Sequence, residues 1–159
     1  MSRSRRGGWP VAWALAASLI LSACGSPAPE PAKFVPPAPS MTELEGPLRA
    51  RYNLLPTLAL GEAVAREYGV ERSAGSALLV VALRRPHPGG DETAIDGEVD
   101  AEVVDLAGRR QTVALRRVAT GDYVDHVGTV EVGPHDTLRV RVGVVVEGRR
   151  QEFDFQRNF

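Results

Sequence analysis

Residues 76–83 read Ser-Ala-Leu-Leu-Val-Val-Ala-Leu, a run that is apolar after its first residue. A short apolar run without polar alternation is typical of a strand that is buried on both of its faces. We therefore expect residues 76–83 to form a central strand, around which the remaining elements pack.

Further strands are expected on both sides of this run. Residues 97–105 alternate strictly between apolar residues, predicted to point inward, and acidic residues, predicted to point outward. The apolar set is Val99, Ala101 and Val103, and the acidic set is Glu98, Asp100 and Glu102. The seven candidate strands are residues 48–54, 76–83, 97–105, 110–118, 123–132, 137–146 and 150–156.

Turn signals separate the later strands at the spacing expected of an all-β sandwich. They are Ala107-Gly108, Gly121-Asp122, Gly133-Pro134 and Glu147-Gly148. A two-residue turn at Glu147-Gly148 pairs Val142 with Phe153 and Val140 with Phe155. Both pairs then lie on one face, so the turn and the apolar pattern agree.

The earlier hairpin predicts a second register. A three-residue loop centred on Gly108 places Val103 opposite Val113 and Asp100 opposite Arg116. A slip by one residue would turn every inward side chain of these strands to the other face.

One short helix is expected between the first two strands. Leu60, Val64 and Tyr68 are spaced by four residues, on one helical face, and Gly69 stands where a C′ glycine would end the helix. The segment 56–73 also holds Leu58, close to Leu54 and Leu55. We expect the segment to cap one end of the sandwich as core closure, and the alternative is an apolar groove for a partner.

A leader precedes these elements. Residues 1–8 are short and basic, and residues 9–21 are apolar and uncharged. The apolar run is too short to cross a hydrocarbon core of ~30 Å comfortably, but it has the length of a signal-peptide h-region. It ends in Leu21-Ser22-Ala23-Cys24, which resembles the lipobox of bacterial lipoproteins.

The resemblance to lipoproteins implies cleavage between Ala23 and Cys24 and attachment of acyl chains to Cys24, so that the protein is anchored in a membrane. Several acyl chains anchor more stably than a single chain. Cys24 is the one cysteine of the chain, which excludes an intrachain disulfide. Gly25 and Ser26 supply no aspartate as an inner-membrane retention signal, so in a bacterium with two membranes the outer membrane is favoured.

The sequence therefore divides into a signal peptide (1–23), a lipidated cysteine with a tether (24–46) and a β-sandwich domain (47–159). Proline fixes φ and lacks an N–H donor, so the proline-rich stretch behind Cys24 is expected to be an extended spacer. The formal net charge is −1, and it falls to −4 without Arg3, Arg5 and Arg6 of the leader. No basic stripe indicates nucleic-acid binding.

Several short motifs of the globular part are similar to those of a bacterial family, the domain of unknown function 4426. They are Tyr52-Asn53, Val64-Ala65, Tyr68-Gly69-Val70, Arg72-Ser73 and Ala77-Leu78-Leu79. The resemblance covers most of residues 48–159. It implies a small exported protein with an immunoglobulin-like sandwich, and it carries over no catalytic residues.

The densest group of charges is acidic. Such carboxylates could ligate calcium, but their spacing matches no EF-hand loop, and three of them alternate along a strand as a solvated face. Arg116 is expected to pair with one of them. The acids are Asp91, Glu92, Asp96, Glu98, Asp100, Glu102 and Asp105.

The three histidines offer little for catalysis. His87 and His135 are predicted in exposed loops, and His126 stands near Asp122 and Asp125. Asp125 and His126 are neighbours on a strand, so they should point to opposite faces. No nucleophile accompanies them, and we expect no catalytic constellation, no cofactor and no metal site.

The sequence favours a lipid-anchored cell-envelope protein that faces the periplasm. Its expected role is that of a non-enzymatic binding or assembly module, with an envelope protein or the cell wall as partner, bound through edge strands or loops. The alternatives are a periplasmic small-ligand or metal-binding protein and, with the least support, a hydrolase.

Overall fold

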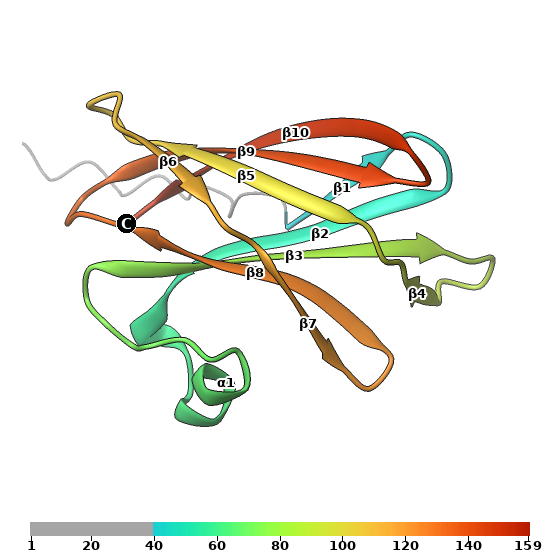
Figure 1. The fold of residues 1–159 in the computed structure, drawn as a ribbon, viewed down its shortest axis with the longest axis horizontal. Coiled ribbons are helices and arrows are strands. Elements are labelled where there is room, and N and C mark those ends of the chain that lie inside the picture. Colours follow the sequence, from blue (N-terminus) through green and yellow to red (C-terminus); the bar gives the residue numbers. More distant parts are fainter. Residues whose placement is uncertain (1–39) are drawn as a thin grey trace, which may run out of the picture. The chain divides into compact units, whose positions relative to one another are not determined.

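A computed structural model describes residues 40–159, which form two antiparallel β-sheets packed face to face (Figure 1). The first sheet has the order β1-β2-β3-β8-β7, with β4 paired to β3, and the second has the order β10-β9-β5-β6. The elements are β1 Met41–Leu44, β2 Leu48–Pro56, the 3-10 turn Thr57–Ala59, α1 Glu62–Glu67, β3 Ser76–Pro86, β4 Glu92–Ala94, β5 Glu98–Val104, β6 Arg110–Val113, β7 Arg116–Thr120, β8 Tyr123–Glu131, β9 Thr137–Val146 and β10 Arg149–Asn158.

This strand order confirms the predicted fold class. An immunoglobulin-like sandwich places strands A-B-E-D in one sheet and C-F-G in the other. Here β2-β3-β8-β7 takes the first order, and β5-β9-β10 takes the second. The predicted leader, the lipobox with Cys24 and most of the tether lie outside the described residues.

β3 is the central strand of the first sheet and is covered on both faces, as predicted. Its odd-numbered residues, among them Leu79 and Val81, point into the space between the sheets. Its even-numbered residues Leu78 and Val80 point to the opposite face, where α1 covers them. An uninterrupted apolar run is therefore what this position in the fold requires.

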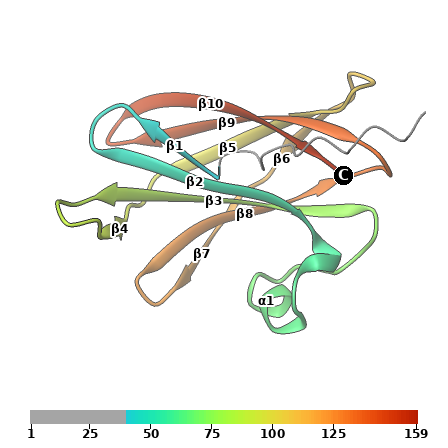
Figure 2. The ribbon, with the colours of Figure 1, turned by 180° about the vertical axis from the view of Figure 1, so that it is seen from behind.

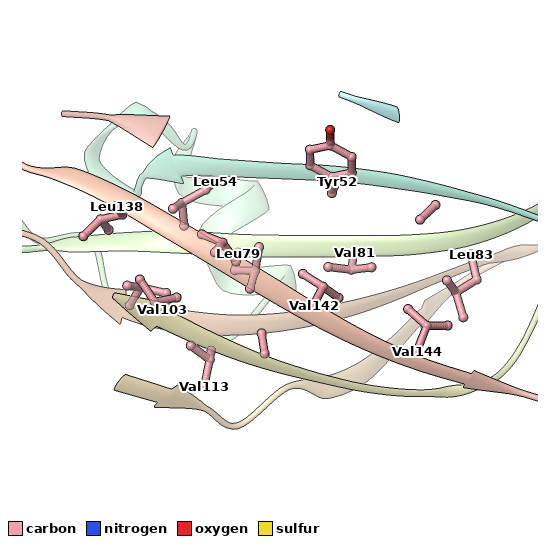
Figure 3. Close-up of a cluster of buried hydrophobic side chains, with 14 of the residues drawn as sticks. Tyr52, Leu54, Leu79, Val81, Leu83, Val103, Val113, Leu138, Val142 and Val144 are labelled. Carbon is pink, nitrogen blue, oxygen red and sulfur yellow. The ribbon is translucent and has the colours of Figure 1, made fainter. Parts of the chain in front are cut away.

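The main core lies between the two sheets (Figure 3). β2 and β3 contribute one wall, and β5 and β9 contribute the other. Burial of each such side chain contributes about 1.5–3 kcal/mol relative to its exposure. The fully buried residues of this core include Leu54, Leu79, Val81, Leu83, Val103, Leu138, Val140, Val142 and Val144.

α1 lies on the side of the first sheet that faces away from the second sheet (Figures 1 and 2). Its end is a Schellman motif, in which Gly69 N–H bonds to the Arg66 carbonyl and Val70 N–H bonds to the Ala65 carbonyl. Gly69 has a φ of 53°, which confirms the predicted C′ glycine. The segment thus covers a sheet face, and the prediction that it caps an end of the sandwich was wrong.

The predicted helical face needs a correction as well. Leu60 is buried and Tyr68 is half-buried, but Val64 is 40% exposed. The helix begins only at Glu62, so Leu60 lies before it and does not share its periodicity. Ala65 is the buried residue of the helix itself.

The strand predicted over residues 110–118 is two strands in different sheets. β6 pairs with β5 in the second sheet, and after Ala114 and Leu115 the chain crosses and continues as β7 of the first sheet. The crossing passes so close to β8 that a Cβ atom at Gly128 would lie 2.7 Å from Val113 Cγ1. Gly128 leaves room for this passage.

β1 lies within the segment predicted to be tether. It pairs with β2 through a turn in which Gly46 has a φ of 76°. With this strand, β4 and the divided strand, residues 40–159 form ten strands in place of the predicted seven. α1 therefore follows the second observed strand, β2, and precedes β3. These two strands are the ones predicted as the first and second, so the predicted place of the helix is confirmed.

One predicted register is confirmed and the other was wrong. β9 and β10 pair Val142 with Phe153 and Val140 with Phe155, as the two-residue turn predicts.

β5 and β6, by contrast, pair Val103 with Gln111 and Ala101 with Val113, two residues away from the prediction. The loop is longer because Asp105 closes it, accepting hydrogen bonds from the Arg109 main chain and side chain. A shift of two residues leaves every side chain on its predicted face, so the apolar pattern could not reveal it.

Candidate functional site

The acidic residues do not converge on a common site. Five of the seven form ion pairs with different arginines: Glu92 with Arg49 and Arg51, Asp96 with Arg117, Asp100 with Arg150, Glu102 with Arg110, and Asp105 with Arg109. Asp100 therefore pairs with Arg150, and the predicted pairing of Asp100 with Arg116 was wrong because Arg116 belongs to the first sheet. Within residues 40–159 no group of three or more His, Cys, Asp or Glu could hold a metal ion.

Glu92 has a structural role. It bridges Arg49 and Arg51 of β2, with oxygen–nitrogen distances of 2.6 and 2.7 Å, and so ties β4 to the sheet. Hydrogen bonds from Arg51 and Arg49 lower the pKa of Glu92 to about 2.

His126 is buried in the rim of the sandwich. Its side chain is on the inner face of β8, and its Nε2 atom lies 2.9 Å from the carbonyl oxygen of Gly97. Asp125 points to the opposite face, as predicted, so the two do not form an acid–base pair. His87, His135 and Asp122 are exposed.

Asp125 belongs to a polar cluster beneath α1. Its Oδ2 atom accepts a hydrogen bond from Tyr68 at 3.0 Å, and its Oδ1 atom accepts one from Arg84 at 3.2 Å. Arg84 also donates to the Val124 carbonyl at 3.1 Å and lies 5.6 Å from the ring centre of Tyr123. Through the hydrogen bond of Tyr68, the cluster attaches the end of α1 to the sheet.

Burial, together with the hydrogen bond to Asp125, raises the pKa of Tyr68 to about 12. The phenol is therefore protonated at neutral pH and acts as the donor to Asp125. No sequence pattern linked Tyr68, at the end of α1, with Asp125 on β8.

The segment 56–73 serves mainly as closure of the sheet face. Leu60, Ala65, Tyr68 and Val70 pack around Leu78. Leu58 remains 50% exposed on the other side of the segment.

One surface hollow of about 190 Å³ lies between β2 and β3, over Val80 and Ala82, and no residue of the segment 56–73 lines it. It is smaller than the ~300–1,000 Å³ typical of small-molecule sites. Among residues 40–159 no helix has the length and apolar character needed to cross a membrane.

The strongest candidate for a functional site is the edge of the second sheet that no other strand among residues 40–159 covers. β10 forms this edge and is ten residues long, without proline and with an unbroken register to β9. The other edge strands, β1, β4, β6 and β7, have three to five residues. Natural proteins shorten, bend or block their edge strands because open edges pair with other chains.

The alternation of hydrogen bonds along β10 shows which of its main-chain groups point away from β9. In an antiparallel ladder, alternate residues direct both N–H and C=O toward the neighbouring strand. Phe159 N–H bonds to the Asp136 carbonyl at 2.8 Å, which continues the β9–β10 register, so the odd-numbered residues face β9. The even-numbered residues point outward, and nothing within residues 40–159 bonds to their main chain; they are Arg150, Glu152, Asp154, Gln156 and Asn158.

The two sides of this edge differ in character. The side chains of the five even-numbered residues are exposed on the outer face of the sheet. On the inner side, the rings of Phe153 and Phe155 are half-buried and lie 5.0 and 4.5 Å from the ring of Tyr52, between ring centres. Small hollows lie at both ends of this seam, one of about 60 Å³ beside Arg149 and one of about 30 Å³ beside Phe155.

The family model of the domain of unknown function DUF4426 matches residues 43–159. The chain belongs to this family. The match begins inside β1, so the DUF4426 domain includes a strand that the sequence-based boundary at residue 47 left out.

A crystal structure of a DUF4426 family protein from Pseudomonas aeruginosa has the same fold. The TM-score is 0.62 at 21% sequence identity, and the alignment covers 76% of this chain and 94% of the other. A search of curated proteins finds no match to this chain.

We expect Tyr68→Phe to lower the free energy of unfolding of the DUF4426 domain by about 1 kcal/mol, because it removes the hydrogen bond to Asp125. The phenol pKa is raised from 10.0 to about 12 in the folded chain, so this stabilisation is complete below pH 10 and is lost as the pH rises toward 12. The difference between the two proteins in urea unfolding should therefore shrink across this range.

Tyr123→Phe is the matched control, since Tyr123 is 65% exposed and its change should cost less than about 0.5 kcal/mol. An equal loss in both variants, or a Tyr68→Phe effect that does not change with pH, would contradict this role of Tyr68.

Proposed function

We propose that this chain is a lipid-anchored cell-envelope protein that binds an extended segment of another polypeptide along β10. The observation that carries the proposal is the ten-residue edge strand whose alternate N–H and C=O groups point outward. Strand addition uses such groups for affinity and the neighbouring side chains for specificity. The role is one of binding or assembly, without catalysis.

The arrangement of the two sheets supports this assignment. The first sheet is shielded by α1 on its outer face and by short strands at its edges. The second sheet ends in a long strand that is firmly held by β9 through ten residue pairs. A rigid strand of this kind offers a preorganised template, which reduces the entropy that a partner loses on binding.

The residues considered for hydrolysis make structural contacts. His126 bonds to the Gly97 carbonyl inside the sandwich, and Asp125 bonds to Tyr68 and Arg84 on the other face. Each thus has a structural partner within residues 40–159.

The anchor is part of the same proposal. Cys24 would carry the acyl chains after cleavage between Ala23 and Cys24, and the proline-rich residues behind it would hold the sandwich away from the membrane. Because β1 begins at Met41, the spacer would end before that residue. The protein would face the periplasm, from the outer membrane where the bacterium has two membranes.

The anchor is tested by labelling cells with a radioactive or alkyne-bearing fatty acid. Wild type should incorporate the label and remain with the membrane fraction, while Cys24→Ser should lose the label and be released from the membrane. Ser22→Thr changes a neighbouring residue of the lipobox but retains the thiol of Cys24, so it serves as the control for expression. Equal labelling of wild type and Cys24→Ser would remove the anchor from the proposal.

Partner binding is tested by photo-crosslinking in cells from positions 154 and 156, with position 112 on exposed β6 as the control. We expect one common protein partner from the two β10 positions and none from the control.

Asp154→Pro, combined with the crosslinker at position 156, should abolish the product. It removes an outward N–H and leaves the ladder to β9 intact. Products that persist with this proline, or that form equally from position 112, would contradict binding along β10.

A further inference from the structure

The charges of β10 discriminate between possible occupants of the edge. A second copy of the chain is the simplest candidate, since two β10 strands could pair antiparallel about a two-fold axis. Because outward main-chain groups must face each other, only registers that pair even with even residues are allowed. These registers can be compared directly.

The two registers with the longest overlap both bring acidic side chains together. When Phe153 faces its own copy, Glu152 lies opposite Asp154 twice. When Asp154 faces its own copy, each Phe153 lies opposite a Phe155, but the two Asp154 carboxylates oppose each other. Like charges directly opposite in neighbouring strands are destabilising, so the strand is protected against its own copy.

Nearby arginines pair with the carboxylates of this edge. Arg141 lies 3.1 Å from Asp154, and Arg150 binds Asp100 at 2.9 Å and Glu152 at 3.3 Å. Arg139 of β9 also lies exposed on this face, so three arginines balance the three carboxylates. Glu152 and Asp154 nevertheless stand on the edge strand itself, next to any strand that is added, whereas Arg139 and Arg141 lie one strand further away.

The inner side of the edge is lined by aromatic rings and therefore favours apolar side chains on an added strand. A strand added to β10 would direct alternate residues toward the seam, where the half-buried rings of Phe153 and Phe155 lie against Tyr52. Its other residues would lie on the outer face opposite Glu152 and Asp154.

We propose that the partner is a foreign extended segment in which basic residues alternate with apolar ones, the basic residues opposite Glu152 and Asp154 and the apolar residues over Phe153 and Phe155. This inference rests on the proposed strand addition and specifies the partner of that same edge. It assigns charge selectivity to the outer face and apolar contact to the seam.

The test uses the purified full chain in detergent and two fluorescent eight-residue peptides, one of alternating lysine and valine and one of alternating glutamate and valine. Two opposite-charge pairs in place of two like-charge pairs should make the lysine peptide bind about two- to thirtyfold more tightly at low salt. N-methylation of its lysine residues, whose N–H groups face β10, should abolish binding, and N-methylation of its valines should not.

The matched protein variant is Glu152→Gln with Asp154→Asn, which keeps the side-chain shapes and removes both charges. It should bind the two peptides about equally, and unaltered urea unfolding serves as its folding control.

The outcomes separate the two levels of the proposal. Binding that N-methylation of the lysines abolishes but that shows no charge preference would overturn the basic–apolar assignment and leave strand addition in place. A wild-type dimer in sedimentation that Asp154→Pro dissociates would overturn it in favour of a second copy. Absence of binding by every peptide, together with absence of self-association, would overturn strand addition itself.

Discussion

The fold depends on β3, a strand whose side chains must be buried on both faces of its sheet. β3 sends Leu79, Val81 and Leu83 into the sandwich core and Leu78 to the opposite face. In an ordinary sandwich only the inner face of each sheet is buried, so the second apolar face of this sheet must be covered by another element. The segment after β2 supplies it with a short helix, which a Schellman motif ends and which the hydrogen bond from Tyr68 to Asp125 attaches to β8.

This cover makes the two sheets unequal. In the first sheet, the outer face is occupied by α1, and β1, β4 and β7 are too short to offer a long template. In the second sheet, no helix covers the outer face within residues 40–159, and its charged residues are solvated. β10 is left as a long, regular edge with an aromatic seam on one side and acids on the other. The candidate function follows from this inequality between the sheets.

Local signals predicted those features of the fold that neighbouring residues determine. The turn at Glu147-Gly148 fixed the register of β9 and β10, because a two-residue turn leaves a single pairing open. Gly69 marked the end of α1 in the same way. The β5–β6 register was predicted wrongly because a shift of two residues leaves every side chain on the same face. The hydrogen bonds of Asp105 within the loop determine the true length of that loop.

Features that depend on distant parts of the chain were not predicted. At Ala114 and Leu115 the chain passes from one sheet to the other, although the sequence there still has the pattern of a strand. Gly128, which leaves room for this passage, lies on β8. The candidate site is of the same kind. The sequence of β10 alternates like that of any half-buried strand, and nothing in it tells that β9 is its only neighbour among the described strands. An edge is a property of the sheet order, so only the structure could locate it.

Residue-resolved amide hydrogen exchange on the full chain tests the central claim most directly. In the free protein, the amides of Phe153 and Phe155 should exchange slowly because they bond to β9, while those of Glu152 and Asp154 should exchange rapidly because they point outward. With the partner bound, Glu152 and Asp154 should become as slow as their neighbours. Uniform protection along β10 in the free chain, or protection on binding that appears at α1 instead, would contradict an open strand edge as the binding site.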